Sequence, residues 1–337
     1  MTADLVLHAL LGLLPVCCFL AALVYLDSYK LVSLRWVLSA IALGCVAALA
    51  SYPLNIAGLA LLGMEFLTYT RYIAPFVEEA LKALVIVVLI RRNRVGFLVD
   101  AAIFGFAVGA GFAIFENLFY LQTRPEMQLG TWVVRGFGTA IMHGGATAIF
   151  AIVTHTLAGQ KWTRGKAIFV PGFVVAVLVH SVFNHFFVAP IVNTMVVLVA
   201  LPLLLTVIFQ QSEKSVSDWL GMGFDADTEL VELINSGEFS VSKVGRYLHS
   251  LTEKFEGPVV VDLLCYLRLH TELSMRAKGL LMMRESGFAN KTGEETKAKL
   301  EELKFLESSI GTTGLMAIKP FLRMSQKDLW QFYMLSS

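Results

Sequence analysis

The stretch YIAPFVEEALKALVIVVLI, residues Tyr72 to Ile90, decides the fold because it has the length and apolar character of a membrane-spanning helix. Three ionisable residues nevertheless lie inside it, namely Glu78, Glu79 and Lys82. A charge near the bilayer centre costs at least ~2.5 kcal/mol on insertion scales, so such residues face the protein interior and mark functional sites. The stretch therefore predicts one helix of a membrane bundle that encloses a polar site.

Apolar windows of similar length recur through the first two thirds of the chain. The 337 residues are 56% hydrophobic and 16% charged, with a mean hydropathy of +0.69, which is typical of a polytopic membrane protein. A shorter apolar segment at 54–63 fits an interfacial or re-entrant piece, or adds an eighth span. The seven expected spans lie near residues 5–26, 34–50, 72–90, 97–121, 132–155, 167–188 and 191–210.

The composition changes abruptly after Gln210, where charged amphipathic segments replace the apolar runs. Apolar residues at helical spacing continue to the end of the chain. We therefore expect an all-α protein, with a transmembrane domain at 1–211 and a soluble, all-helical cytoplasmic domain at 212–337. The second domain would offer a surface for self-association or for a partner.

The short loops at 91–94 and 161–166 are rich in arginine and lysine, and such loops usually lie in the cytoplasm. This orientation predicts an outer N-terminus and a cytoplasmic C-terminus. The first residues lack the cationic region of a secretory signal, so we expect them to form a retained first span. The net charge of +1 and the absence of a basic motif exclude nucleic acid as a partner.

Polar residues also occur in the three spans that follow the quoted stretch. They are Glu116, then His143, then His180 with Asn184 four residues later on the same helix face. At ~1.5 Å of rise per residue, one polar group on each of these three spans lies at a depth similar to that of Glu78, roughly 6–17 Å below the outer boundary. The shared depth predicts that the side chains meet in one polar site.

Spacing within each helix assigns neighbours to these groups. Glu78 and Glu79 lie four and three residues before Lys82, so either carboxylate can pair with the lysine while the other stays available. Phe112 and Tyr120 lie four residues before and after Glu116 in the next span, which sets that carboxylate between two aromatic side chains.

Taken together, these residues resemble the motifs of the PrsW family of intramembrane proteases, which are distantly related to the type II CAAX prenyl proteases. The motifs are E-E-x-x-K at 78–82, F-x-x-x-E-x-x-x-Y at 112–120, a histidine at 143 and H-x-x-x-N at 180–184. They occupy a core at about 73–187. The CAAX relatives carry a histidine where this chain has Glu116, which argues against processing of prenylated proteins.

The resemblance implies an endopeptidase that cleaves membrane-anchored proteins near the non-cytoplasmic side of the bilayer. Because the namesake member acts on a single-span anti-sigma factor, regulated proteolysis in a bacterial cell membrane is expected. Glu78 would activate water, and Glu79, held by Lys82, would support it, although the two roles could be exchanged.

The remaining motif residues have expected roles as well. Glu116 and His143 would position the water, directly or through a divalent metal, and His180 and Asn184 would donate hydrogen bonds to the developing oxyanion. The cofactor stays open, with zinc as one candidate. Its candidate ligands are Glu78, Glu116, His143 and His180.

Two rival functions follow from the same residues. A proton-coupled transporter would also place Glu, Lys and His near the middle of the membrane, but it should show inverted hydropathy repeats and broken helices. A non-catalytic scaffold or receptor would act through its cytoplasmic domain and retain the motifs only for packing.

Overall fold

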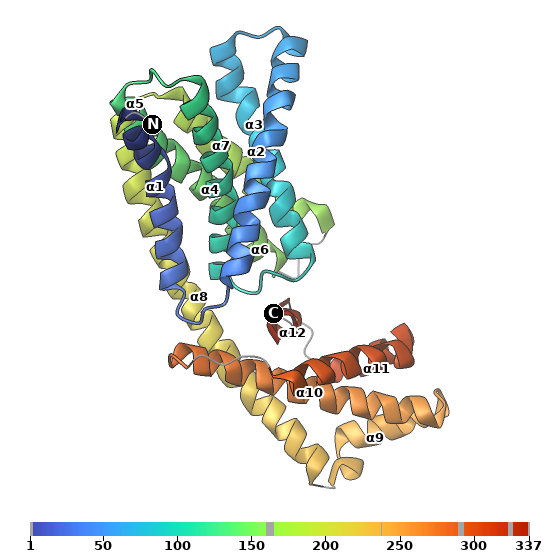
Figure 1. The fold of residues 1–337 in the computed structure, drawn as a ribbon. Coiled ribbons are helices and arrows are strands. Elements are labelled where there is room, and N and C mark those ends of the chain that lie inside the picture. Colours follow the sequence, from blue (N-terminus) through green and yellow to red (C-terminus); the bar gives the residue numbers. More distant parts are fainter. Residues whose placement is uncertain (1–2, 160–164, 237, 289–292, 323–325, 336–337) are drawn as a thin grey trace. The chain divides into compact units, whose positions relative to one another are not determined.

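In the computed structural model, every regular element of the described residues is a helix, as expected for an all-α protein (Figure 1). The described residues are 3–159, 165–236, 238–288, 293–322 and 326–335, so part of the expected loop at 161–166 lies outside them. The chain divides into two compact units. The first comprises 1–27 and 32–212, and the second comprises 28–31 and 213–337.

The seven expected spans of the first unit fall largely on helical segments. Within the described residues, five helical segments are long and apolar enough to cross a membrane, namely 4–26, 34–62, 98–123, 129–158 and 190–235. The helix that contains Glu78 is too rich in charge for this criterion, and the helix that contains His180 has only 17 residues. The helices are α1 (Ala3–Leu26), α2 (Leu34–Leu62), α3 (Phe66–Arg91), α4 (Leu98–Thr123), α5 (Leu129–Val133), the π-helical η1 (Val134–Thr139), α6 (Ala140–Ala158), the short η2 (Gly165–Ile168), α7 (Phe169–His185) and α8 (Pro190–Asn235), which continues into the second unit.

The segment 54–63 is not a separate interfacial, re-entrant or spanning piece, so that prediction was wrong. It continues α2 through Pro53 to Leu62, and Gly63 ends the helix at a φ of 59°. At 1.5 Å per residue, 29 residues extend ~43 Å, longer than the ~30 Å hydrocarbon core. The added turns bring polar side chains of α2 alongside α3.

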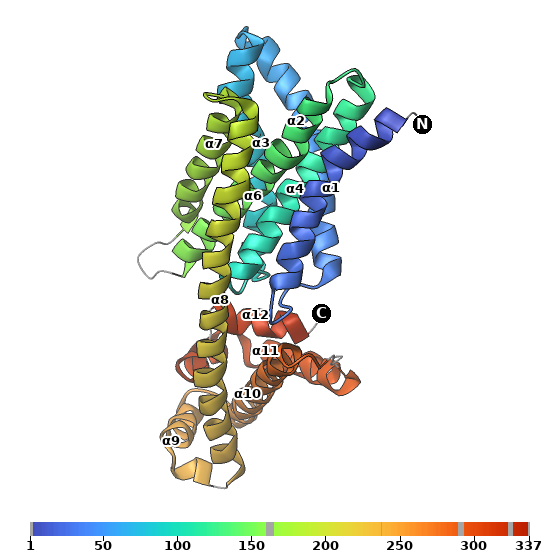
Figure 2. The ribbon, with the colours of Figure 1, turned by 90° about the vertical axis from the view of Figure 1, so that its left-hand side faces the viewer.

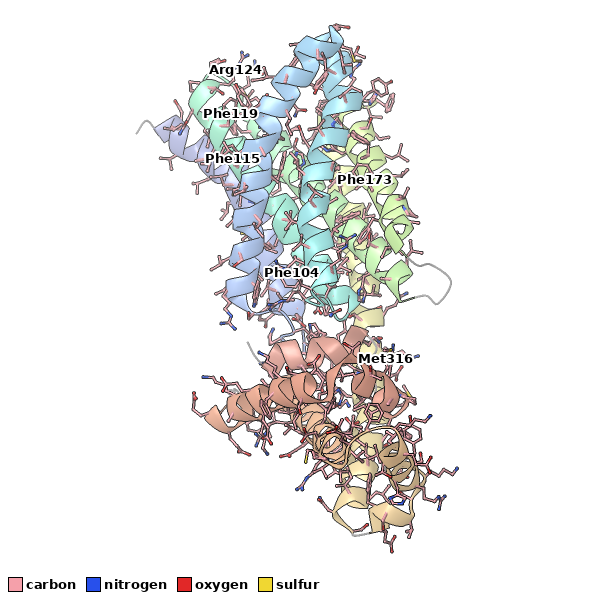
Figure 3. The ribbon with its side chains drawn as sticks, turned by 90° about the vertical axis from the view of Figure 1, so that its right-hand side faces the viewer. Phe104, Phe115, Phe119, Arg124, Phe173 and Met316 are labelled. Carbon is pink, nitrogen blue, oxygen red and sulfur yellow. The ribbon has the colours of Figure 1, made fainter. Side chains whose placement is uncertain are left out.

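Helix α4 forms the centre of the first unit and packs against α1, α2, α3 and α6. Its glycines permit the close approach of α6, since a Cβ at Gly109 would lie 2.2 Å from the carbonyl oxygen of His143. At its start, the carboxylate of Asp100 accepts hydrogen bonds from the backbone N–H groups of Gly96 and Phe97. Figure 3 shows Phe104, Phe115 and Phe119 in order along this helix, with Arg124 just after its end.

Helix α6 lies between α4 and α7, and α3 packs against both α2 and α7 (Figure 2). The rings of Phe76 on α3 and Phe173 on α7 meet edge to face with centroids 5.2 Å apart. This arrangement surrounds the middle of α3 with α2, α4, α6 and α7, of which the last three carry polar motif residues.

The second unit is built around α10 (Gly257–Glu285), which packs against α9, α11 and α12. Besides a leucine-rich core it contains a buried polar network in which Lys278 pairs with Asp227 and donates to Ser274 Oγ at 2.9 Å. The remaining helices are η3 (Glu238–Val241), α9 (Lys243–Ser250), η4 (Leu251–Glu253), α11 (Glu294–Ile318), η5 (Lys319–Phe321) and α12 (Gln326–Leu335).

Candidate active site

The two adjacent glutamates of α3 have different surroundings. Glu79 is 2% exposed, and its Oε1 accepts hydrogen bonds from Lys82 Nζ at 2.5 Å and from His180 Nδ1 at 2.8 Å. Lys82 is fully buried, and its Nζ also lies 3.0 Å from His143 Nδ1. Glu79, three residues before Lys82, is thus the partner of the lysine, and the pair links α3 to α6 and α7.

Glu78 has fewer partners. Its Oε1 accepts a hydrogen bond from Asn55 Nδ2 at 3.1 Å, and its Oε2 lies 3.8 Å from His180 Nε2. Asn55 Oδ1 in turn accepts from the hydroxyl of Tyr69 at 3.2 Å. Gly58 leaves room for this hydroxyl, because a Cβ there would lie 2.4 Å from it. A chain of two hydrogen bonds therefore orients the carboxylate of Glu78.

Sequence reasoning missed both members of this chain. Asn55 lies in the segment that was expected to be interfacial or re-entrant, and Tyr69 precedes the expected start of the third span. A single polar residue in an otherwise apolar run was the available signal for Asn55, since a buried amide in a membrane helix usually has a partner.

Glu116 on α4 lies between two basic side chains. Its Oε1 lies 3.3 Å from an Arg135 guanidinium nitrogen, and its Oε2 lies 3.3 Å from His143 Nε2. Arg135 Nε also donates to Asn117 Oδ1 at 2.9 Å. Arg135 is a third residue that sequence reasoning did not place in the site.

The π turn η1 explains how Arg135 reaches the site. In a regular α-helix, residues eight positions apart differ by ~80° around the axis, whereas the additional residue of a π turn reduces this difference to about 20°. Arg135 lies in the π turn and His143 lies eight residues later on α6. Both side chains consequently face Glu116.

The aromatic residues that flank Glu116 in sequence contact its polar neighbours. The Phe112 ring lies 5.0 Å from the His143 ring and 4.7 Å from Lys82 Nζ. The guanidinium of Arg135 lies 3.8 Å from the ring centroid of Tyr120. These contacts are cation–π and ring-packing interactions, and they hold the cationic side chains in place.

Asn184 makes a hydrogen bond that leads away from the cluster. Its Nδ2 donates to the backbone carbonyl of Thr70 at 3.0 Å, and Ser181 Oγ donates to the carbonyl of Arg71 at 2.6 Å. The two bonds fasten α7 to the first part of α3. The amide of Asn184 thus supports the helix that carries His180.

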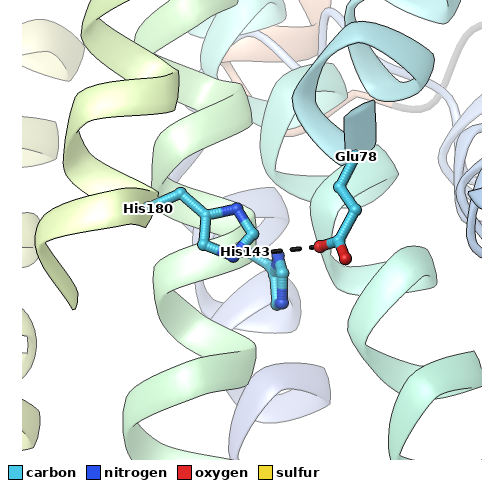
Figure 4. Close-up of side chains that lie close together, drawn as sticks. All are labelled: Glu78, His143 and His180. Atoms are coloured by element: carbon cyan, nitrogen blue, oxygen red, sulfur yellow. Dashed lines mark ion pairs between the residues drawn. The ribbon is translucent and has the colours of Figure 1, made fainter. Parts of the chain in front are cut away.

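Three side chains form a group that can hold a metal ion. Glu78, His143 and His180 each offer a ligand atom, and these atoms lie within 4.8 Å of one another (Figure 4). Two imidazoles and a carboxylate are a donor set of catalytic zinc sites. His180 Nδ1 is fixed by Glu79, which turns Nε2 toward Glu78, as expected for a ligand oriented by a carboxylate. Glu116, the fourth ligand expected from the sequence, is outside this group.

The charges of the cluster also suit a cation. Three carboxylates, those of Glu78, Glu79 and Glu116, face the two fixed cations Lys82 and Arg135. One negative charge is therefore left over among these side chains, and an uncompensated buried charge is costly in a membrane. A bound cation or a proton balances it, so the residues present fit a metal ion.

Comparison with known proteins gives one match. Residues 32–208, more than half of the chain, match the sequence model of the PrsW family intramembrane metalloprotease. No curated protein and no solved structure matches the chain. The matched region contains α2 to α7, which carry every residue of the site described above. The chain therefore belongs to the PrsW family of intramembrane metalloproteases and is an integral membrane peptide hydrolase.

Proposed function

We propose that the protein cleaves membrane-anchored protein substrates near the non-cytoplasmic side of the bilayer, with a water molecule activated at Glu78. The observation that carries this proposal is the unequal use of the two glutamates. Glu79 is occupied by Lys82 and His180, whereas Glu78 is held by one amide and lines a cavity. Glu78 therefore has a free side for water and substrate.

The chain's own groups supply the following chemistry. Glu78 accepts a proton as the water oxygen bonds to the scissile carbonyl carbon, and then delivers it to the leaving nitrogen. Asn55 fixes the direction of the Glu78 carboxylate, and Glu79 with Lys82 fixes the ring of His180. Glu116 and Arg135 hold His143 from the other side.

Glu78, His143 and His180 would hold the divalent cation that the family description implies. When bound, such a cation lowers the pKa of water and polarises a carbonyl group. Glu79 and Glu116 lie behind these ligands and would keep the two imidazole rings oriented toward Glu78.

The helices at the seven expected spans support a seven-span topology. The arginine-rich loop at 91–94 favours a cytoplasmic position, which puts the N-terminus outside and the C-terminus in the cytoplasm. We infer a bacterial cell membrane and a substrate like an anti-sigma factor from the family alone. In this reading, the second unit is a cytoplasmic domain.

Cleavage of a co-expressed single-span substrate tests the proposal. Glu78→Gln should abolish cleavage, while Glu126→Gln, a matched change at an exposed glutamate of the α4–α5 loop, should preserve it. Equal product from wild type and Glu78→Gln would remove the proposed role of Glu78. If the same variant instead loses the uptake of a solute, the result would indicate a transporter.

Metal content provides a separate test. Purified wild-type protein should contain about one equivalent of a divalent metal, and His143→Ala and His180→Ala should each lose it. His249→Ala, at an exposed position of α9, is the control. Undiminished metal in the two site variants would show that these imidazoles are not ligands.

A further inference from the structure

A cavity of about 220 Å³ adjoins the cluster on the side of Glu78. It lies between α2, α3 and α4, and Glu78 and Glu116 form part of its wall. The cavity and the proposed catalytic centre are therefore continuous. A group bound in the cavity would lie beside the carboxylate that activates water.

Most of the cavity wall is apolar and aromatic. Phe115 and Phe119 contribute from α4 (Figure 3), and Tyr52 and Ile56 contribute from α2. The Tyr52 and Phe119 rings lie 5.0 Å apart, so they close one side together. Glu78, Asn55 and Glu116 add polar groups to this wall, which a peptide bond would need.

The α2 wall faces the outside of the bundle. Tyr52 is 50% exposed and Ile56 is 53% exposed, so a segment of a membrane-embedded protein can reach the cavity from the surface of α2. An apolar cavity of about 150 Å³ accommodates a benzene molecule. A cavity of about 220 Å³ is therefore large enough for a phenyl or a branched aliphatic side chain.

We propose that this cavity is a specificity pocket for one large apolar side chain of the substrate, next to the peptide bond that is cleaved. The inference rests on the proposed function, since it assigns the reacting bond to Glu78. An aromatic wall with an acidic end selects against an acidic side chain and favours phenylalanine or leucine over alanine. Ile56, exposed and at the rim of the α2 wall, controls the available volume.

Substrate variants define the test. The cleaved bond of a single-span substrate is mapped with wild-type enzyme, and each flanking position is then changed to alanine or phenylalanine. At one position, phenylalanine should be cleaved about 10-fold faster or more. Ile56→Trp should abolish this preference by slowing the phenylalanine substrate while the alanine substrate is cleaved as before.

Leu54→Trp is the matched control, because Leu54 is on the same helix, is 50% exposed and does not line the cavity. It should retain the wild-type preference. An identical preference in Ile56→Trp and Leu54→Trp, or no size preference in wild type, would overturn the pocket while Glu78-dependent cleavage persists. If instead the proposed function is wrong, Glu78→Gln will leave cleavage unaffected.

Crosslinking gives a readout that does not require turnover. Benzophenone-alanine at position 56, in the Glu78→Gln background, should crosslink to the phenylalanine substrate and less to the alanine substrate. The same label at position 54 should show no such difference. Crosslinks at position 56 to lipid alone would indicate that the cavity holds an acyl chain, and would refute the proposal.

Discussion

Replacing Lys82 by methionine should destabilise the first unit strongly, and adding Glu79→Gln should restore most of the loss. The single change leaves a carboxylate that is 2% exposed without its cation, whereas the double change removes both charges. The amide that Glu79→Gln introduces can still accept the hydrogen bond from His180 Nδ1.

The expected magnitude follows from the burial of the pair. Removing one member of a buried ion pair costs about 3–5 kcal/mol, while replacing the whole pair by neutral side chains is often close to neutral. At about 2–4 °C per kcal/mol, Lys82→Met should lower the unfolding temperature by on the order of 10 °C. The double variant should remain within a few degrees of wild type.

Thermal unfolding of the purified full-length protein in one detergent measures these shifts. The exposed pair Lys297 and Glu294 on α11 has the same i, i+3 spacing and a distance of 2.7 Å, so it serves as the control. Lys297→Met and Glu294→Gln should each change stability by less than about 1 kcal/mol. If the losses of Lys82→Met and Glu79→Gln instead add up in the double variant, the two charges are not energetically coupled and the assignment of Glu79 to Lys82 is wrong.

Three further predictions concern two residues outside the sequence motifs, Asn55 and Arg135, and one residue of the second unit, His270. Asn55→Leu should lower the rate of cleavage about 10- to 100-fold with little change in unfolding temperature, because the amide orients Glu78. Arg135→Leu should destabilise the protein by about 1–3 kcal/mol, because Glu116 loses a charged partner, and thermal unfolding measures this. Burial lowers the pKa of His270 to about 4, so thermal unfolding at pH 7.5 and pH 5 should show a loss of stability on acidification.

The direction of this pH dependence follows from the pKa of His270 in the unfolded and in the folded chain. Its pKa is about 6.5 in an unfolded chain and lower in the fold, so its contribution is complete above about pH 6.5 and is lost as the pH falls toward 4, by at most about 3 kcal/mol. Asp227 and Asp328 oppose the shift and Lys278 adds to it. His270→Phe should remove this pH dependence, and an unchanged profile in that variant would assign it to other groups.

Two outcomes would contradict the other predictions. Wild-type cleavage by Asn55→Leu would show that Glu78 needs no support from α2, and Asn235→Leu, at an exposed position at the end of α8, is its control for expression and folding. Unchanged stability in Arg135→Leu would mean that water replaces the guanidinium at Glu116.

Helical periodicity predicted the short-range part of the site. Glu79 and Lys82 lie on one helix, so their spacing alone allowed the ion pair that forms. The choice between Glu78 and Glu79 could not be made from spacing, since both can reach the lysine.

The part of the site that could not be predicted from the sequence depends on contacts between helices. Asn55 reaches Glu78 only because α2 continues past Pro53, and hydropathy windows cannot show whether an apolar run bends or continues. Asn184 shares a helix face with His180, yet its amide finds a backbone carbonyl of α3. Periodicity fixes the face on which a side chain lies, whereas the neighbouring helix decides which partner it meets.

The π turn at Val134–Thr139 makes backbone conformation itself a determinant of activity. An ordinary α-helix is the more favourable backbone on its own. Relaxation of the segment into that form at unchanged length would swing the guanidinium of Arg135 about a quarter of a revolution away from the carboxylate it shares with His143. Deleting one residue between them would bring both side chains back to one face, because seven positions of an α-helix differ by only about 20°.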